Sequence, residues 1–249
     1  MKKEHINEVA WGKILTFFRG FEGIYIGCQR KFKKFIEAVF WMARTGAQWR
    51  ELPFYYGDWN SVFKRFNAWS KKNIWGKLLE YLAEDCDLEY VMIDATIVRA
   101  HACAAGYGEQ PEQGLDRSAG GFTSKIHAKV DALGNLLKFV VTAGQVSDIA
   151  QAHNLLADVH DAHVLGDKGY HSKDLKAMLE NNDCIVVITP KVNTIEPWDY
   201  DKHLYKERHL IECFFSKIKY FRRVFSRFDK SIRNYTSFVS FVGACLWLR

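Results

Sequence analysis

The sequence has no run of roughly eighteen uncharged apolar residues, so we expect no membrane-spanning helix and no membrane partner. Its six cysteines are scattered without a CxxC pair, which argues against a zinc site or a disulfide framework and favours a reducing compartment. The N-terminal segment is charged and has no apolar signal core, so secretion is not expected. Neither internal repeats nor a low-complexity tail are present. These absences predict a globular cytoplasmic protein.

The charge of the chain is unevenly distributed. Hydrophobic residues make up 48% and aromatic residues 15% of the 249 residues, as in a protein with a full core. Residues 1–83 carry 15 Lys and Arg against 7 acidic residues, residues 84–201 carry 9 against 19, and residues 202–249 carry 11 against 3. Two basic arms suit a polyanion, which the acidic middle repels unless cations intervene. A chance distribution of solvated charges is the alternative.

Residues 1–85 are predicted to be helical and basic. Apolar residues recur at three-to-four spacing from residue 31 until Gly46 ends the pattern. A second helix is expected from Asn60 or Ser61 as its cap, with Phe63, Phe66 and Trp69 inward and with Lys64 and Arg65 outside. Short basic helices around aromatic residues are typical of a DNA-binding module, in which Lys64 and Arg65 contact DNA. A plain helical cap on the next domain is the alternative.

From Glu89 the period changes to that of strands. The expected order is strand, strand, strand, helix, strand, helix, strand and then a long helix from about Leu204. The second and third strands form a hairpin that turns at residues 134–135. The Gly-rich stretch between Cys103 and Thr123 is expected to be a loop. The pattern predicts an α/β domain.

Three carboxylates stand out in this domain. Asp94 lies at the centre of a buried strand, Asp167 follows a strand end next to Gly166, and Glu212 lies on the last amphipathic helix. If the two strands are neighbours and the helix packs across them, the three acids converge and need cations to stay ionised. Carboxylate oxygens suit two Mg²⁺ ions, or Mn²⁺, which activate a water or a 3′-hydroxyl for phosphodiester displacement. Each acid alone could instead be a cap, a strand end or part of an ion pair.

The final helix is expected to place Tyr205, Arg208, Glu212 and Lys219 on one face, at about 100° per residue. Its opposite face is apolar and consists of Leu210, Ile211, Phe214, Ile218 and Phe221. In the catalytic interpretation, Arg208 and Lys219 hold the DNA backbone beside the metals. The alternative is a solvated Arg–Glu pair that contributes only a few tenths of a kcal/mol. Lys168, next to Asp167, could contact phosphate or be solvated.

The run from Tyr205 through Arg208 and Glu212 to Lys219 resembles the signature around the catalytic Glu of DDE transposases of bacterial insertion sequences. Residues 45–53 (TGAQWRELP) resemble the N-terminal module of the insertion-sequence-5 family. Three further segments resemble motifs of that family, namely 94–101, 121–127 and 167–170. His171 departs from the family, many members of which have Asp there.

The resemblance implies a ribonuclease-H-like fold, a five-stranded mixed sheet flanked by helices and preceded by a small all-α module. We therefore expect a DNA-binding module at 1–85 and a catalytic domain at 86–249. Asp94, Asp167 and Glu212 would be the catalytic residues and metal ligands, and Tyr205 would join the DNA contacts. The implied activity is cut-and-paste transposition between inverted-repeat ends and target DNA, by a homodimer or higher assembly associated with the nucleoid.

Two alternatives stay open. A catalytically silent descendant could occupy the element ends and repress, although a binder does not need three buried acids. A ribonuclease-H-like nuclease or resolvase would share the chemistry without the N-terminal helical module.

Overall fold

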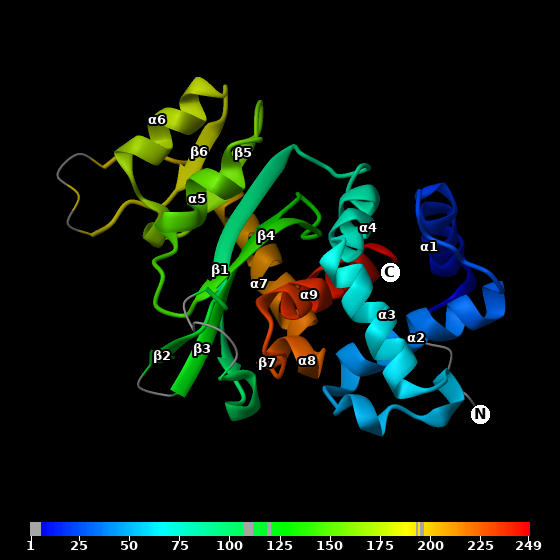
Figure 1. Cartoon of the computed structure of the whole chain (residues 1–249). Helices are drawn as coiled ribbons and strands as arrows, with labels where there is room; N and C mark the ends of the chain where they lie inside the picture. Colours follow the sequence, from blue (N-terminus) through cyan, green and yellow to red (C-terminus); the bar gives the residue numbers. More distant parts are fainter. Residues whose placement is uncertain (1–5, 107–111, 119–120, 193, 195–196) are drawn as a thin grey trace. The chain divides into compact units, whose positions relative to one another are not determined.

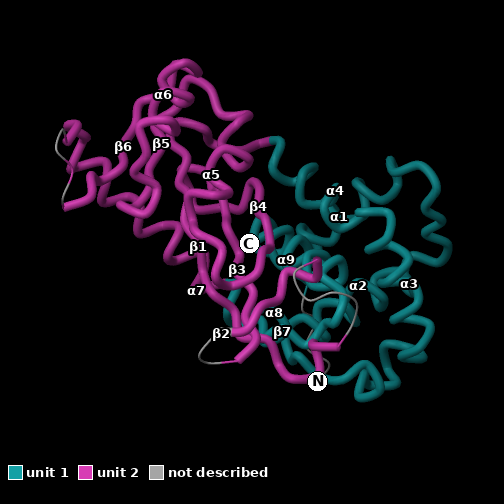
Figure 2. Tube along the Cα trace, turned by 60° about the vertical axis from the view of Figure 1, so that its left-hand side comes forward, with its two compact units in different colours: residues 1–84, 218–249 teal, residues 85–217 magenta. Residues whose placement is uncertain are grey.

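The computed structural model describes residues 6–106, 112–118, 121–192, 194 and 197–249 (Figure 1). The chain divides into two compact units, which Figure 2 shows in different colours. Unit 1 combines residues 1–84 with residues 218–249, and unit 2 is the continuous segment 85–217. Unit 1 is therefore built from both ends of the chain. No helix within the described ranges is long and apolar enough to cross a membrane.

Unit 1 is helical, apart from a two-residue strand. Its elements are α1 (Glu8–Gly20), α2 (Gln29–Thr45), the 3₁₀ turns η1 (Trp49–Glu51) and η2 (Phe54–Tyr56), α3 (Trp59–Lys71), α4 (Ile74–Leu82), α8 (Arg222–Phe225), β7 (Ser226–Arg227) and α9 (Ile232–Trp247). Aromatic rings form much of its core. The ring of Phe66 stacks on that of Phe238 at 4.4 Å between centroids, and Phe18 stacks on Trp69 at 4.8 Å. Aromatic burial of this kind joins α3 to α9 and α1 to α3.

The expected helix that ends before Gly46 is confirmed as α2, whereas the cap expected for α3 was wrong. Asp58, not Asn60 or Ser61, caps α3, because its carboxylate accepts the backbone N–H of Ser61 at 2.8 Å. Asp and Ser are both good caps, so composition alone did not place the start of the helix.

The expectation that Arg65 lies on the outside was also wrong. Its guanidinium lies over the rings of Phe35, Trp69 and Phe32 at 4.4, 4.8 and 5.3 Å, and burial lowers its pKa. Lys64, the preceding residue, is exposed as expected. A planar guanidinium stacks well on aromatic faces, which makes Arg65 part of the core packing of unit 1.

A buried ion pair joins α8 to the segment after β7, and a hydrogen bond joins α8 to the loop after α2. Arg223 donates from Nε and Nη2 to the two carboxylate oxygens of Asp229 at 2.9 and 3.0 Å. Its Nη1 donates to the carbonyl of Ala47 at 2.9 Å. Arg223 is 4% exposed and Asp229 7%, so both charges depend on each other for compensation.

Two glycines of unit 1 are expected to respond to alanine in opposite directions. Gly46 ends α2 with φ of 66°, and a Cβ there would meet Arg222 Cβ at 3.1 Å and Phe228 Cε2 at 3.2 Å. Gly46→Ala should therefore lower the free energy of unfolding by about 1–2 kcal/mol. Gly12, inside α1, has open space around it, so Gly12→Ala should raise it by about 0.5–1 kcal/mol. Urea unfolding of both variants measures this, and shifts of equal sign would contradict the expectation.

Unit 2 is an α/β structure. Its strands are β1 (Tyr90–Ala100), β2 (Asp116–Ser118), β3 (Gly121–Val130), β4 (Leu136–Ala143), β5 (His163–Gly166) and β6 (Ile185–Ile188). Its helices and turns are η3 (Ala102–Ala104), α5 (Ile149–Leu156), η4 (Lys168–Tyr170), α6 (Lys173–Asn181), η5 (Leu204–Arg208) and most of α7 (His209–Lys219). The predicted order of strands and helices is confirmed, with the short β2 added. The loop expected between Cys103 and Thr123 was wrong at residues 116–118, which form β2, and at residues 121–122, which begin β3; residues 107–111 and 119–120 lie outside the described residues.

The sheet of unit 2 is mixed. The strand order is β2-β3-β1-β5-β6. Strand β4 also pairs with β3, which therefore pairs with β1, β2 and β4. Strands β1 and β3 are antiparallel, as are β3 and β4, whereas β5 runs parallel to both β1 and β6. The five principal strands thus have the order β4-β3-β1-β5-β6, with the first strand in the centre. This is the ribonuclease-H-like mixed sheet that was expected.

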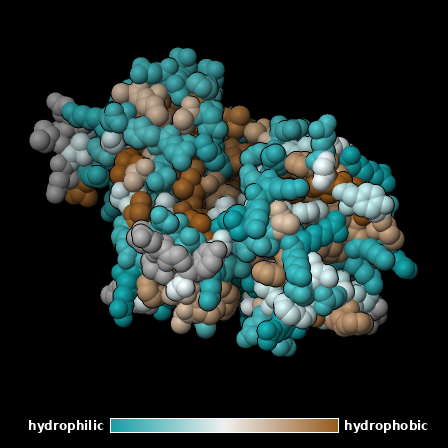
Figure 3. Space-filling model, in the orientation of Figure 1, coloured by the Kyte–Doolittle hydropathy of each residue, from teal (hydrophilic) through white to brown (hydrophobic). Residues whose placement is uncertain are grey.

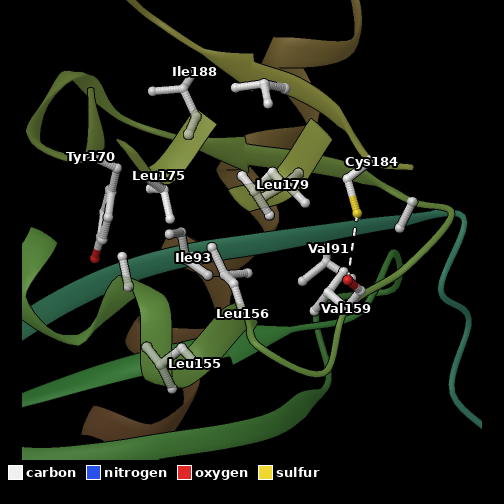
Figure 4. Close-up of a cluster of buried hydrophobic side chains, with 14 residues drawn as sticks. Val91, Ile93, Leu155, Leu156, Val159, Tyr170, Leu175, Leu179, Cys184 and Ile188 are labelled. Carbon is white, nitrogen blue, oxygen red and sulfur yellow. Dashed lines mark hydrogen bonds between the residues drawn. The ribbon is translucent and has the colours of Figure 1, made fainter. Parts of the chain in front are cut away.

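Helices cover the sheet on the side of a buried cluster shown in Figure 4. There Ile93 of β1 packs among Leu155 and Leu156 of α5 and Leu175 of α6. Because successive residues of a strand point to opposite faces, Asp94 points away from this cluster. The cluster fixes which side chains of β1 are available for a site on the other face.

The two units differ from the expected domains at one place. The boundary after residue 84 is close to the expected one at 85, but residues 218–249 pack in unit 1 rather than with the rest of 86–249. The charges follow the units: unit 1 holds 22 Lys and Arg against 9 Asp and Glu, and unit 2 holds 13 against 20. On the face shown in Figure 3, hydrophobic residues form patches between larger hydrophilic areas.

Candidate active site

Two of the three predicted acids lie level with each other on neighbouring strands. Strands β1 and β5 are parallel, with Val91 opposite Val164 and Met92 opposite Leu165. Continuing this register by two residues places Asp94 level with Asp167, which directly follows β5. The carboxyl ends of parallel strands are where open α/β sheets bind ligands. The sheet thus brings together two acids that are 73 positions apart in the sequence.

Asp167 is held in a tight turn. Its Oδ1 accepts the backbone N–H of Gly169 at 2.7 Å and so caps η4. A Cβ on Gly169 would lie 2.8 Å from that oxygen, so this position suits only glycine without a shift of the acid. The other oxygen of Asp167 has no such restraint from the turn. Lys168, the predicted phosphate contact, is exposed in the same turn.

The side chain of Arg208 connects Glu212 to Asp94. Arg208 Nη1 donates to Asp94 Oδ2 at 2.9 Å, and Nη2 donates to Glu212 Oε1. The side chains of Arg208 and Asp94 are 18% and 19% exposed, whereas that of Glu212 is 56% exposed. Arg208 therefore lies between Asp94 and Glu212 and compensates both charges.

The predicted continuous α-helix around these residues was wrong at its start. Tyr205 and Arg208 lie in the 3₁₀ turn η5, and the α-helix begins only at His209. A 3₁₀ turn advances by about 120° per residue instead of 100°, so the expected shared arc does not hold for Tyr205. The ring of Tyr205 packs edge-on against Tyr200, at 5.6 Å between centroids. The apolar face of α7 is largely as expected, since Ile211, Phe214 and Ile218 are buried and Leu210 is half-buried.

The surroundings of Asp94 disfavour an uncompensated negative charge on its carboxylate. Burial raises the pKa of Asp94, and the nearby carboxylate of Asp167 raises it further, while the Ala95 N–H and Arg208 act in the opposite direction. For Arg208, burial alone would lower the pKa, but Asp94 and Glu212 outweigh it and raise the pKa. The site therefore favours a cation beside Asp94.

The donor chemistry of the acids fits a hard divalent ion, since carboxylate oxygens are its preferred ligands. Among the described residues, no three His, Cys, Asp or Glu side chains are grouped closely enough to hold a metal. Arg208 is in direct contact with two of the predicted ligands. Lys219 lies at the end of α7 and is half-buried, and the structure tests neither its role nor that of the other predicted DNA contacts.

Two buried polar groups near the site were not predicted as functional. The hydroxyl of Tyr170 is fully buried and has no hydrogen-bond partner among the described residues, and burial and the charge of Asp94 raise its pKa. His127 on β3 is also fully buried, with Nε2 at 2.9 Å from Thr142 Oγ1 and with no hydrogen-bond partner for Nδ1 in the described part of the chain. Their only sequence signal is their place in the segments 167–170 and 121–127.

The buried His127 predicts a pH dependence of stability. Burial lowers its pKa from the ordinary value of 6.5 to about 4. In the unfolded chain His127 is protonated below about pH 6.5, whereas in the folded chain it is protonated only below about pH 4. The free energy of unfolding therefore falls as the pH drops from 6.5 to 4. His127→Gln, which keeps an N–H for Thr142, should flatten this part of the curve. The urea unfolding midpoints of the wild type and of His127→Gln, measured from pH 7 to 4, test this expectation. Parallel curves of midpoint against pH would show that His127 is not the responsible group.

Two protein families match this chain. Residues 6–79 match the family described as "Putative transposase of IS4/5 family", and residues 86–242 match the family described as "Transposase DDE domain". A Brucella ovis protein named "Putative transposase for insertion sequence element IS6501" is 37% identical over 131 residues, which cover 51% of this chain and 99% of that protein. An uncharacterized protein of Sinorhizobium fredii, y4sN, is 38% identical over 106 residues, 43% of this chain and 85% of the relative.

Two solved transposase structures show a low similarity to this chain. A piggyBac transposase synaptic complex with hairpin DNA is 12% identical, with a TM-score of 0.43 over 75% of this chain and 48% of that chain. A pre-cleavage Mos1 transpososome is also 12% identical, with a TM-score of 0.29 over 94% of this chain and 83% of that chain. This chain thus spans about half the length of the first and most of the second.

Proposed function

This chain belongs to the DDE transposases, and from that premise we propose that it catalyses cleavage at the ends of a DNA element and strand transfer into target DNA. The observation that carries the proposal is the arrangement of the three acids. Asp94 lies within β1, level with Asp167 just after the neighbouring parallel strand β5, and Arg208 links Asp94 to Glu212. A site with three carboxylates and one cation suits chemistry at a phosphodiester.

Asp94, Asp167 and Glu212 would together hold two Mg²⁺ ions, for which Mn²⁺ can substitute. When bound, the ions supply the charge that activates a water or a 3′-hydroxyl and stabilises the leaving oxygen. The residues of the chain would position them. The turn at Gly169 orients Asp167, and the hydrogen bond from the Ala95 N–H to Asp94 Oδ1 at 2.8 Å orients Asp94. Such restraints reduce the reorganisation needed before reaction.

DNA recognition is proposed to come mainly from unit 1. Its excess of Lys and Arg over acidic residues suits a phosphate backbone, whereas unit 2 carries an acidic excess. Exposed Lys64 is a candidate phosphate contact, with Lys168, Tyr205 and Lys219 as further candidates. Arg65 stacks on core rings, so it can offer DNA at most the exposed part of its guanidinium. Inverted-repeat ends held by a dimer or a larger assembly would complete the active complex.

A strand-transfer assay tests the proposal. Purified full-length protein is incubated with Mg²⁺, a donor plasmid carrying the inverted repeats that flank the gene, and a target plasmid. Joined products that depend on the repeats are expected. Cleavage of any DNA without joining would replace the proposal with a nuclease or resolvase. Specific binding of the repeats without cleavage would replace it with a silent repressor.

A further inference from the structure

Arg208 contacts oxygen atoms that a divalent ion would need. It donates to Oδ2 of Asp94 at 2.9 Å and to Oε1 of Glu212, so its fork joins two acids that come from β1 and α7. The contact with Asp94 is largely shielded from water, since the two side chains are 18% and 19% exposed. This differs from a surface ion pair on one helix, which contributes little.

The guanidinium of Arg208 and a divalent metal ion compete for these oxygen atoms. A guanidinium that donates to Asp94 Oδ2 and Glu212 Oε1 uses one lone pair on each oxygen and fills the space between these two oxygens. Charge-assisted hydrogen bonds of this kind are the strong ones in proteins. An ion that binds between these two oxygens must therefore displace Arg208, and the free energy of that displacement weakens metal binding.

We propose that Arg208 is a positioning residue that holds Asp94 and Glu212 in place before metal binds, and that it then transfers to a DNA phosphate. The inference rests on the proposed function. A phosphate is the partner that the displaced side chain fits, because a guanidinium binds phosphate oxygens with the same two-pronged geometry as a carboxylate. By linkage, DNA that accepts Arg208 strengthens metal binding, and metal strengthens DNA binding by the same factor.

The first test measures metal affinity without DNA. Mn²⁺ is titrated into full-length protein and the free ion is followed by electron paramagnetic resonance. Arg208→Gln is expected to bind Mn²⁺ roughly tenfold more tightly or better, because no charge-assisted hydrogen bonds must be broken. Arg208→Lys, which keeps the charge without the fork, should lie between the two. Lys206→Gln is the matched control, since Lys206 is exposed in the same turn η5, and it should change affinity by about twofold or less.

An unchanged or weaker Mn²⁺ affinity of a folded Arg208→Gln protein would overturn the proposal, because an arginine that only braces the fold predicts that result. An equal gain in Lys206→Gln would also overturn it, since the effect would then be general charge. Circular dichroism and thermal melting establish that each variant is folded. If Arg208→Gln does not fold, the Arg208→Lys titration decides, with unchanged affinity counting against the proposal.

The second test measures the transfer to phosphate. Binding to a random-sequence duplex is followed across a salt series with and without Ca²⁺, which prevents turnover. In the wild-type protein Ca²⁺ should increase the slope of log affinity against log salt by about 0.9, the value for one added phosphate contact. In Arg208→Gln the slope should not respond to Ca²⁺, and an equal response in both proteins would overturn the transfer. Neither test requires strand transfer, so failure of the proposed function is seen separately in the plasmid assay.

Discussion

Strand transfer is expected to fall by about three orders of magnitude or more in Asp94→Asn, Asp167→Asn and Glu212→Gln, because several kcal/mol of transition-state stabilisation come from metal ions that the carboxylate charges hold. Each substitution keeps the size of the side chain and one acceptor oxygen while removing its charge. DNA binding measured without divalent metal should stay within about twofold, since Lys and Arg side chains rather than these acids contact phosphates. Joined plasmid products and gel-shift affinities are the two measurements.

Glu180→Gln is the control for the loss of a negative charge from unit 2. Glu180 lies on α6, where its side chain makes an exposed pair with Lys176 at 3.4 Å, so strand transfer should be unchanged. Near-normal strand transfer by Glu212→Gln in Mg²⁺ would remove Glu212 from the catalytic set. The assignment of Asp94 and Asp167 would then rest on their own variants.

The largest loss of stability is expected at the buried pair of unit 1. Asp229→Ala removes the partner of Arg223 and leaves a guanidinium that is 4% exposed without its two carboxylate contacts. Breaking such a pair from one side costs about 3–5 kcal/mol. The denaturant midpoint of Asp229→Ala, measured with that of the wild type, gives this difference.

Glu8→Ala is the matched control. Glu8 pairs with Lys33 at 2.6 Å, but its side chain is 76% exposed, so its loss should cost less than about 1 kcal/mol. The double variant Arg223→Met with Asp229→Leu should recover part of the stability, because it removes both charges and keeps the volume. Equal losses of unfolding free energy in Asp229→Ala and Glu8→Ala would mean that burial does not increase the contribution of the Arg223–Asp229 pair to stability.

Much of the fold was accessible from sequence because the period of apolar residues changes where the structure changes. The strand of Asp94 and the strand that precedes Asp167 are dominated by apolar and β-branched residues, and parallel pairing explains why the two acids lie level with each other. The sequence also predicts the end of α2, because Gly46 adopts the left-handed conformation that few other residues tolerate. These features depend on local chemistry.

The features that could not be predicted depend on contacts that are distant in sequence. Spacing identifies Arg65 as a cation on a helix but does not tell whether it faces water or the rings of Phe35 and Trp69. In the same way, the four-residue spacing of Arg208 and Glu212 predicts their pairing, but the contact of Arg208 with Asp94 requires the register of the sheet. Long polar side chains have several possible partners, and only the tertiary structure selects among them.

The division of unit 1 between both ends of the chain has a consequence for synthesis on the ribosome. Unit 2 is continuous, so all its residues have been made once residue 217 has been added. Unit 1 must wait for residues 218–249, since Phe66 of α3 stacks on Phe238 and Trp75 of α4 packs edge-on against Phe241. Chains grow at about 5–20 residues per second, and domains fold as units. The nascent protein therefore completes its acidic unit, with Asp94, Asp167 and Glu212, before its basic unit.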